Sequence, residues 1–142
     1  EKRSCTILPM RRRKLAILPD NDHALRGMLQ RLMRVLPRIL NGRVLAAMVI
    51  GSVAEGRAGD RSDLDLLLFL TKGLPTRGHY RYWDSSVASR LGKCPFPLQP
   101  IFVSKDAVRT EEPNLAAAIR KGILLWDRGG LFRRKKAWST RT

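Results

Sequence analysis

Two aspartates stand at the start of an apolar run of the sequence. Asp63 and Asp65 open residues 63–70, and the other residues of this run are all apolar. In a β-strand, side chains alternate between two faces, so both aspartates would project the same way while the leucine between them points into a core. Two adjacent carboxylates repel each other unless a cation lies between them, and hard oxygen pairs of this kind suit Mg²⁺ or Mn²⁺. The pattern therefore predicts a divalent metal site at the start of this strand.

A glycine and a serine follow a second apolar run, Val44–Ile50. Gly51 would let backbone N–H groups approach a phosphate closely, and Ser52 would add a hydroxyl. We expect a helix over residues 53–57, which would point its positive end at the same place. Mg²⁺ also binds oxygens of a substrate phosphate. Together with the two aspartates, this turn predicts a site for a nucleoside triphosphate.

The order and spacing of these residues resemble the signature of the nucleotidyltransferase superfamily that includes DNA polymerase β, and particularly its small single-domain members, the minimal nucleotidyltransferases. That signature is an apolar strand, Gly-Ser, a connecting segment, and Ser-Asp-x-Asp before further apolar residues. The sequence matches it at Gly51, Ser52, Ala54, Gly56, Ala58, Ser62, Asp63, Asp65 and Leu66. Either half alone would be a weak signal. The alternative for the whole stretch is a β-hairpin with a glycine-rich loop and two solvated aspartates, and the combination of both halves favours the family. The resemblance covers about residues 22–127.

The resemblance implies an α/β (α+β) domain of the polymerase-β-like fold, with a mixed central β-sheet and helices mainly on one face. It also implies Mg²⁺-dependent transfer of a nucleoside monophosphate from a nucleoside triphosphate, expected to be ATP, to a hydroxyl of a protein or small molecule. Asp63 and Asp65 would be the catalytic residues and the metal ligands, and Gly51, Ser52 and Ser62 would bind the nucleotide. A HEPN-type helical protein is the protein partner that minimal nucleotidyltransferases suggest.

The position of the third carboxylate departs from the family pattern. Polymerase-β-like sites take a third carboxylate from the following strand, and alignment places Gln99 there. A glutamine carbonyl can contact a metal or a ribose, but it carries no charge and cannot accept a proton. Asp84 and Asp106 are the nearby acids, and neither fits the spacing well. Two functions therefore stay open: an active nucleotidyltransferase, or a catalytically weakened module of this fold that binds nucleotide, RNA or a partner protein.

Several further elements are predicted from apolar periodicity and from turn residues. Besides Val44–Ile50 and residues 63–70, strands are expected over residues 96–103 and 123–126. Helices are expected from a cap at Asp20 or Asp22 to a stop at Asn41-Gly42 with a kink at Pro37, and over residues 79–91 and 110–121. The core positions expected in the first helix are Leu25, Leu29, Leu32, Leu36 and Ile39, and those expected in the second are Tyr82, Trp83, Val87, Ala88 and Leu91. Because Val44–Ile50 has no polar residue, it should be buried on both faces.

Length and hydropathy limit the organisation of the chain. A sequence of 142 residues is one domain by the usual size prior, so its substrate site should be shallow or shared within a homo-oligomer. No apolar run approaches the roughly 20 residues needed to cross a bilayer, so no membrane association is expected. Two cysteines, Cys5 and Cys94, lack metal-ligand spacing, which favours a reduced, cytoplasmic setting.

The charge is strongly positive and unevenly distributed. The formal net charge is +16, and residues 1–14 and 128–142 each hold six Lys or Arg residues. We therefore divide the chain into a basic N-terminal arm (residues 1–19), a nucleotidyltransferase domain (residues 20–127) and a basic C-terminal tail (residues 128–142). Such ends attract polyphosphates and nucleic acid without reading sequence, although they also serve solubility.

Arginines also line one flank of the first predicted helix. Arg31, Arg34 and Arg38 recur at helical spacing there. They fit either a solvated outer face or a surface for RNA or an acidic partner.

Overall fold

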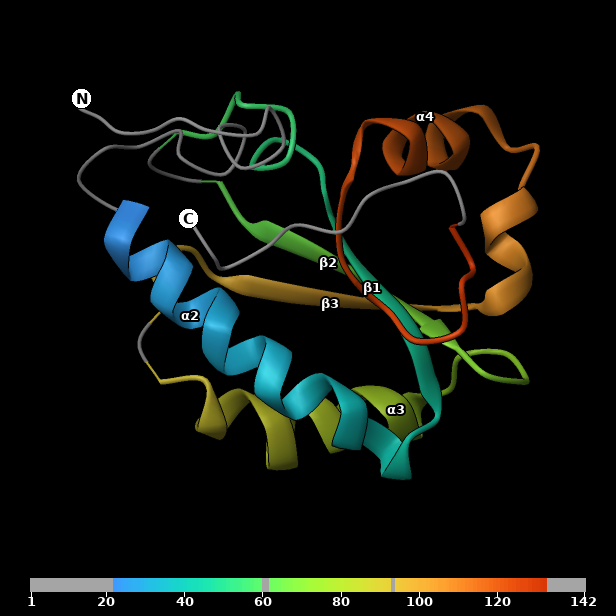
Figure 1. Cartoon of the computed structure of the whole chain (residues 1–142), viewed down its shortest axis with the longest axis horizontal. Coiled ribbons are helices and arrows are strands. Elements are labelled where there is room, and N and C mark those ends of the chain that lie inside the picture. The colour runs from blue at the N-terminus through green and yellow to red at the C-terminus, as the bar shows by residue number, and fades with distance from the viewer. Residues whose placement is uncertain (1–21, 60–61, 93, 133–142) are drawn as a thin grey trace.

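A four-stranded mixed sheet forms the centre of the computed structural model (Figure 1), which describes residues 22–59, 62–92 and 94–132. The strands are β1 (Val44–Ile50), β2 (Leu64–Leu70), β3 (Leu98–Ser104) and β4 (Ile123–Asp127). Their order across the sheet is β3-β2-β1-β4, with β2 and β3 parallel and the other neighbours antiparallel. The α+β class and the mixed central sheet predicted from the sequence are confirmed.

Helical segments cover both faces of this sheet. They are α2 (Asp22–Val35), η2 (Leu36–Asn41), α3 (Arg77–Tyr82), η3 (Trp83–Val87), η4 (Ala88–Arg90), η5 (Lys105–Arg109) and α4 (Pro113–Lys121). The segments from α2 to η2 and from α3 to η4 pack on one face, which we call the helical face (Figure 1). The other face, the α4 face, is covered by α4 and η5. Most helical residues therefore lie on one face, as predicted.

β1 is a central strand, and its composition explains its burial. Six of its seven residues are buried, and Leu45 is half-buried. Val49 belongs to the hydrophobic cluster on the helical face, and Met48 belongs to the cluster on the α4 face. Because both faces of the strand are covered, a segment without polar residues exposes no apolar surface to water. The predicted burial of Val44–Ile50 is confirmed.

The first predicted helix has its expected core and its expected kink. The predicted core residues are each at most 1% exposed, and they are Leu25, Leu29, Leu32, Leu36 and Ile39. α2 ends at Val35, and a 3-10 turn follows with Pro37 near its start. Proline lacks an N–H group and disfavours helical geometry in the residue before it, which explains the break. Gly42 ends the turn with a φ of +83°. The predicted cap, Asp20 or the side chain of Asp22, lies outside the described residues.

The helix predicted over residues 79–91 forms over residues 77–90 and changes geometry part-way. The α-helical α3 gives way to the π-helical η3 and then to the 3-10 helix η4. Trp83, Val87 and Leu91 are buried as predicted, whereas Ala88, also predicted for the core, is exposed. A π turn contains more residues than an α turn, so the positions after it rotate away from the phase of an α-helix.

Residues 128–132, which the sequence assigned to the C-terminal tail, still pack on the sheet. The Asp127 carboxylate accepts hydrogen bonds from the N–H groups of Leu131 and Phe132, each at 2.8 Å. The Phe132 ring then meets Phe69 edge-on at 5.2 Å. The arm at residues 1–19 and the rest of the tail lie outside the described residues, so these domain boundaries stay a prediction.

None of the helices in the described ranges combines the length and the apolar character that spanning a membrane requires.

Gly122 lets α4 approach β1 closely. A Cβ atom at this position would lie 2.7 Å from Met48 Sδ and 3.0 Å from the Ala118 carbonyl oxygen. Met48 is fully buried, so its side chain has little room to move. We expect Gly122→Ala to lower the free energy of unfolding by about 1–3 kcal/mol, the usual cost of overpacking a core, as measured by urea unfolding. The control is Gly59→Ala, because a Cβ atom there meets nothing within 4 Å. Equal stability of the two variants would contradict this packing.

Candidate active site

Three strand termini meet at one end of the sheet. β1 ends at Ile50, and β2 and β3 begin at Leu64 and Leu98. The register aligns Ile50 with Asp65, and Asp65 with Gln99. Residues aligned across neighbouring strands project to the same face, and Ile50 belongs to the hydrophobic cluster on the α4 face. Asp65 and Gln99 are therefore neighbours on the α4 face, at the end of the sheet.

Asp63 and Asp65 form the acidic part of this site. Asp63 is exposed and directly precedes β2, whereas Asp65 is half-buried. Burial, and after it the negative charge of Asp63, raise the pKa of the Asp65 carboxyl above its ordinary value. The two carboxylates are thus close enough to repel each other. A cation between them would relieve this repulsion, so the pair is chemically suited to a divalent ion.

Gly51 lies directly against Asp65. Its φ of +82° falls in the left-handed region that glycine adopts without strain. A Cβ atom at this position would lie 2.7 Å from Oδ2 of Asp65, so a side chain here would collide with the carboxylate. The sequence predicted a close backbone approach at Gly51 but not this contact. The two residues become neighbours only through the pairing of β1 with β2.

The helix predicted over residues 53–57 is wrong. The structure has a turn there, in which the Arg57 N–H donates to the Ser52 carbonyl at 2.8 Å, a wider spacing than an α-helix uses. Gly56 adopts a φ of +74°, which stops helical geometry before it can propagate. Within residues 51–59 no helix dipole therefore supports a bound phosphate. Contact with a phosphate would depend on backbone N–H groups and on the Ser52 hydroxyl.

The charged side chains of this turn neutralise each other. The Arg57 guanidinium donates to Glu55 Oε1, from Nη2 at 3.1 Å and from Nε at 3.4 Å. Arg61, the next basic residue, lies outside the described residues. The described turn therefore adds no net positive charge, and a bound cation would have to supply the electrostatic attraction for a triphosphate.

Ser62 shapes the loop that leads into β2. Its hydroxyl accepts a hydrogen bond from the Gly59 N–H at 2.8 Å, and its own N–H donates to the Gly59 carbonyl at 3.1 Å. The Leu64 N–H donates to the Pro97 carbonyl at 2.8 Å, which fixes the start of β2 against the segment before β3. Asp63 is thus held between two anchored residues. Sequence reasoning missed Pro97, because its contribution comes from a backbone carbonyl.

No third carboxylate joins the site within the described residues. They contain no group of three or more His, Cys, Asp or Glu side chains that could hold a metal ion. Gln99 is exposed at the third position, beside Asp65. Asp84 lies on η3, on the opposite face of the sheet, and Asp106 follows the far end of β3 and pairs with Arg109 at 3.2 Å. Two carboxylates and one carboxamide suit a single Mg²⁺ that takes its remaining oxygens from phosphate and water.

Comparison with protein-family models and with curated proteins gives no match for this sequence. Among solved structures, the chain is similar to the crystal structure of a putative nucleotidyltransferase from Sulfolobus solfataricus. The similarity covers 80% of this chain and 88% of that chain, with 18% sequence identity and a TM-score of 0.48. This likeness concerns the arrangement of helices and strands and says nothing of substrate or acceptor.

Proposed function

We propose that this protein is a Mg²⁺-dependent nucleotidyltransferase that transfers a nucleoside monophosphate from a nucleoside triphosphate, expected to be ATP, to a hydroxyl group. One arrangement supports the proposal: the Asp65 carboxylate lies against Gly51 on one side and is aligned with Gln99 on the other, and Asp63 is close enough to act on its charge. A carboxylate pair suited to Mg²⁺ thus adjoins a backbone turn that can contact phosphate. A purely structural strand end would gain nothing from two carboxylates that repel each other.

Each site residue has a role in this proposal. Asp63 and Asp65 would hold Mg²⁺ or Mn²⁺ through carboxylate oxygens. The N–H groups of the Gly51-Ser52 turn and the Ser52 hydroxyl would bind the β- and γ-phosphates. Ser62 would act on the nucleotide site through the loop that it closes. When bound, the ion would neutralise phosphate charge and polarise the reacting phosphoryl group.

The reaction itself would form one bond and break one. The acceptor oxygen would bond to the α-phosphorus, and pyrophosphate would leave with the bridging oxygen. The Gln99 carboxamide can orient a ribose or a water but cannot take the hydroxyl proton, which would pass to solvent. Catalysis would therefore come mainly from positioning and charge neutralisation.

The same glutamine favours a second candidate function. Without a third carboxylate in the described part of the chain, the site suits one ion better than two. A module of this kind would bind nucleotide in a Mg²⁺-dependent way and turn it over slowly or not at all. Its biological ligand would then be the nucleotide, an RNA or a partner protein.

The acceptor is also part of the proposal. The resemblance to minimal nucleotidyltransferases suggests a Tyr or Ser hydroxyl of a HEPN-type helical partner, or a small-molecule hydroxyl. Asp63 and Gln99 are exposed at the end of the sheet, so the described site is accessible to either kind of acceptor.

The deciding experiment combines labelling with binding. The protein is incubated with cell lysate, Mg²⁺ or Mn²⁺, and nucleoside triphosphates radiolabelled on the α-phosphate, with the Asp63→Asn, Asp65→Asn double variant as control. Label that appears on an acceptor only with the wild-type protein supports the enzyme. Mg²⁺-dependent ATP binding without label supports the binding module. If neither is seen, or if the double variant behaves like the wild type, both proposals are wrong.

A further inference from the structure

The helical face carries an unusual distribution of charge. Residues 22–43 and 77–92, which build this face, contain eight arginines, no lysine and two aspartates. Their formal excess is therefore six positive charges. All described residues together contain 15 Lys or Arg and nine Asp or Glu, which is also an excess of six. The described residues outside this face therefore carry no net charge. The positive charge of the described body thus resides on the helical face, and arginine alone supplies it.

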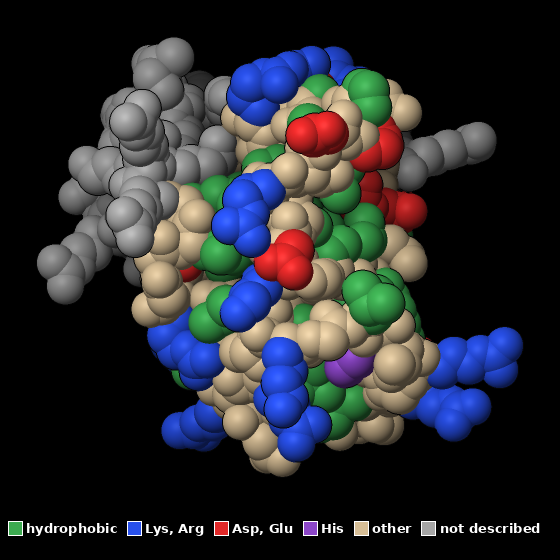
Figure 2. Space-filling view, turned by 90° about the vertical axis from the view of Figure 1, so that its right-hand side faces the viewer, with side chains coloured by type: hydrophobic (Ala, Val, Ile, Leu, Met, Phe, Trp, Pro, Cys, Tyr) green, Lys and Arg blue, Asp and Glu red, His purple; other side chains and the backbone are tan. Residues whose placement is uncertain are grey.

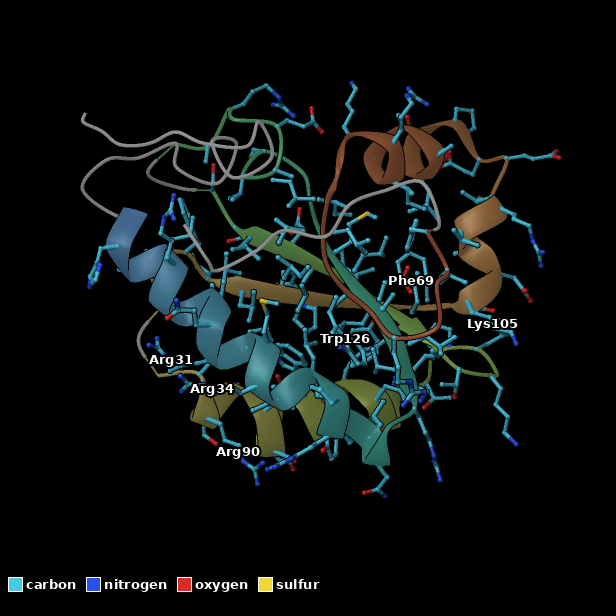
Figure 3. All side chains as sticks on the ribbon, in the orientation of Figure 1. Arg31, Arg34, Phe69, Arg90, Lys105 and Trp126 are labelled. Carbon is cyan, nitrogen blue, oxygen red and sulfur yellow. The ribbon has the colours of Figure 1, made fainter. Side chains whose placement is uncertain are left out.

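Three of these arginines gather where two helical segments meet. Arg31 Nε donates to the Leu91 carbonyl at 2.6 Å, which ties α2 to the end of η4. Arg34 lies one turn further along α2, and Arg90 is the last residue of η4. Figure 3 shows Arg31, Arg34 and Arg90 on the same side of the molecule. We call this surface the α2–η4 seam.

The seam presents its charge to solvent. Arg34 and Arg90 are both exposed. Among the described residues, no carboxylate forms an ion pair with either of them. The side of the molecule over η5 differs, because acidic side chains lie among the basic ones there (Figure 2) and Arg109 pairs with Asp106. The seam is thus a region of one charge sign, whereas the opposite layer is mixed.

The composition of the seam favours a phosphate backbone over a protein partner. Stable protein interfaces have an apolar or aromatic centre. The exposed large hydrophobic residues of the described chain are Leu74 and Tyr80, in the loop after β2 and on α3, and neither belongs to the seam. The planar guanidinium group of arginine binds phosphate oxygens through two parallel hydrogen bonds, which a lysine ammonium cannot do.

We propose that the α2–η4 seam binds the phosphate backbone of a nucleic acid without reading its sequence. Arg34 and Arg90 would contact neighbouring phosphates, and Arg31 would keep the two helical segments in place through Leu91. Because the seam lies on the face opposite Asp65 and Gln99, this inference does not rest on the proposed enzymatic function.

The test compares two variants that lose the same charge from opposite layers. Arg34→Gln, Arg90→Gln alters the seam, and Lys105→Gln, Lys121→Gln alters exposed residues of η5 and α4. The probes are a fluorescent single-stranded RNA of mixed sequence and a DNA duplex of equal length, titrated with the full chain at several salt concentrations. Matching melting temperatures would establish that both variants fold.

The seam variant should weaken binding about tenfold or more, and the control variant by less than about threefold. The slope of log affinity against log salt should fall by about 1.4 for RNA and about 1.8 for the duplex, because two phosphate contacts are lost. Equal losses in the two variants would mean that the basic ends or the total charge bind nucleic acid, and would overturn the proposal. So would competition by polyglutamate as strong as by RNA, which would indicate an acidic protein ligand. The Asp63→Asn, Asp65→Asn variant should bind RNA like the wild type even if it has lost all nucleotidyl transfer.

Discussion

Replacing Asp65 by asparagine should stabilise the metal-free protein near neutral pH and remove its response to Mg²⁺. Burial and the charge of Asp63 raise the pKa of the Asp65 carboxyl, so the folded state holds this proton more tightly than the unfolded state does. The stability gained from that proton is fully present below the unfolded pKa and is lost as the pH rises through the raised folded pKa. At neutral pH the ionised Asp65 therefore costs free energy, and an uncharged amide of the same shape avoids that cost.

Bound Mg²⁺ should make the wild type more stable than the Asp65→Asn variant. Mg²⁺ between the two carboxylates would relieve their repulsion, so the melting temperature of the wild type should rise with added Mg²⁺. We expect Asp65→Asn to lower Mg²⁺ affinity by about tenfold to a hundredfold or more. Removing a group that only orients a metal ligand already causes a loss of that size, and Asp65 would itself be a ligand. Thermal unfolding with and without Mg²⁺, at acidic and neutral pH, measures both effects.

Asp84→Asn is the matched control for this prediction, since Asp84 is exposed on η3 and lies far from the site. It should leave both the melting temperature and its Mg²⁺ dependence unchanged. If Asp65→Asn destabilised the protein and kept the Mg²⁺ response, Asp65 would have a structural role and would not be a metal ligand.

The sequence predicted well the strands and helices whose structure is determined by the apolar pattern and turn residues of their own segment. Val44–Ile50 is apolar throughout, and a strand buries such a segment completely only when both of its faces are covered. The core positions of α2 follow from helical periodicity, and Pro37 explains why α2 stops where it does. In both cases the determining residues are close together in the chain.

The errors arose where local pattern was ambiguous. Residues 53–57 contain good helix formers, but Gly56 has a positive φ and interrupts the segment. Too few residues remain to offset the free-energy cost of nucleating a helix. Ala88 was assigned to the core from α-helical spacing, and the π geometry of η3 shifted it outward. No composition cue in residues 83–87 marks a π segment.

The sequence was sufficient to name the residues of the candidate site but not to predict their contacts. The Gly-Ser and Asp-x-Asp segments could be recognised as candidates because each is contiguous in sequence. The approach of Gly51 to Asp65 depends on the β1–β2 register, and the place of Gln99 depends on the β2–β3 register. A parallel pair such as β2 and β3 is joined by a long connection, so sequence alone leaves its register open.

The β2–β3 register also settles a question about Pro100. A proline in a strand can shift the pairing by one residue, which would turn Gln99 to the other face. The pairing runs without a shift from Leu64 opposite Leu98 to Leu70 opposite Ser104. The reason lies on the outer edge of β3. The Phe102 N–H points outward and donates to the Tyr80 hydroxyl at 3.1 Å, and Pro100, two residues earlier, has its nitrogen on the same side. Its missing N–H therefore costs no bond to β2.

Gln99→Asp should convert a site suited to one ion into a site that binds two. Gln99 is exposed and aligned with Asp65 on the α4 face, so an aspartate there would add a third carboxylate. Three converging carboxylates bind divalent ions better than two, and a second ion can stabilise the attacking and leaving oxygens. We expect Mg²⁺ affinity to rise about tenfold or more, equal to about 1.4 kcal/mol, and nucleotidyl transfer to increase with it. Isothermal titration and the radiolabel assay measure the two effects.

Gln99→Asn is the control for this change, because asparagine has the size of aspartate without its charge. It should leave Mg²⁺ affinity near that of the wild type, so any gain in Gln99→Asp can be attributed to charge. Without metal, Gln99→Asp should melt below Gln99→Asn near neutral pH, since a third ionised carboxylate would repel Asp63 and Asp65. Should the two variants match in metal affinity, in transfer and in metal-free stability, Gln99 does not face the ion. The wild-type site would then act with its two aspartates alone.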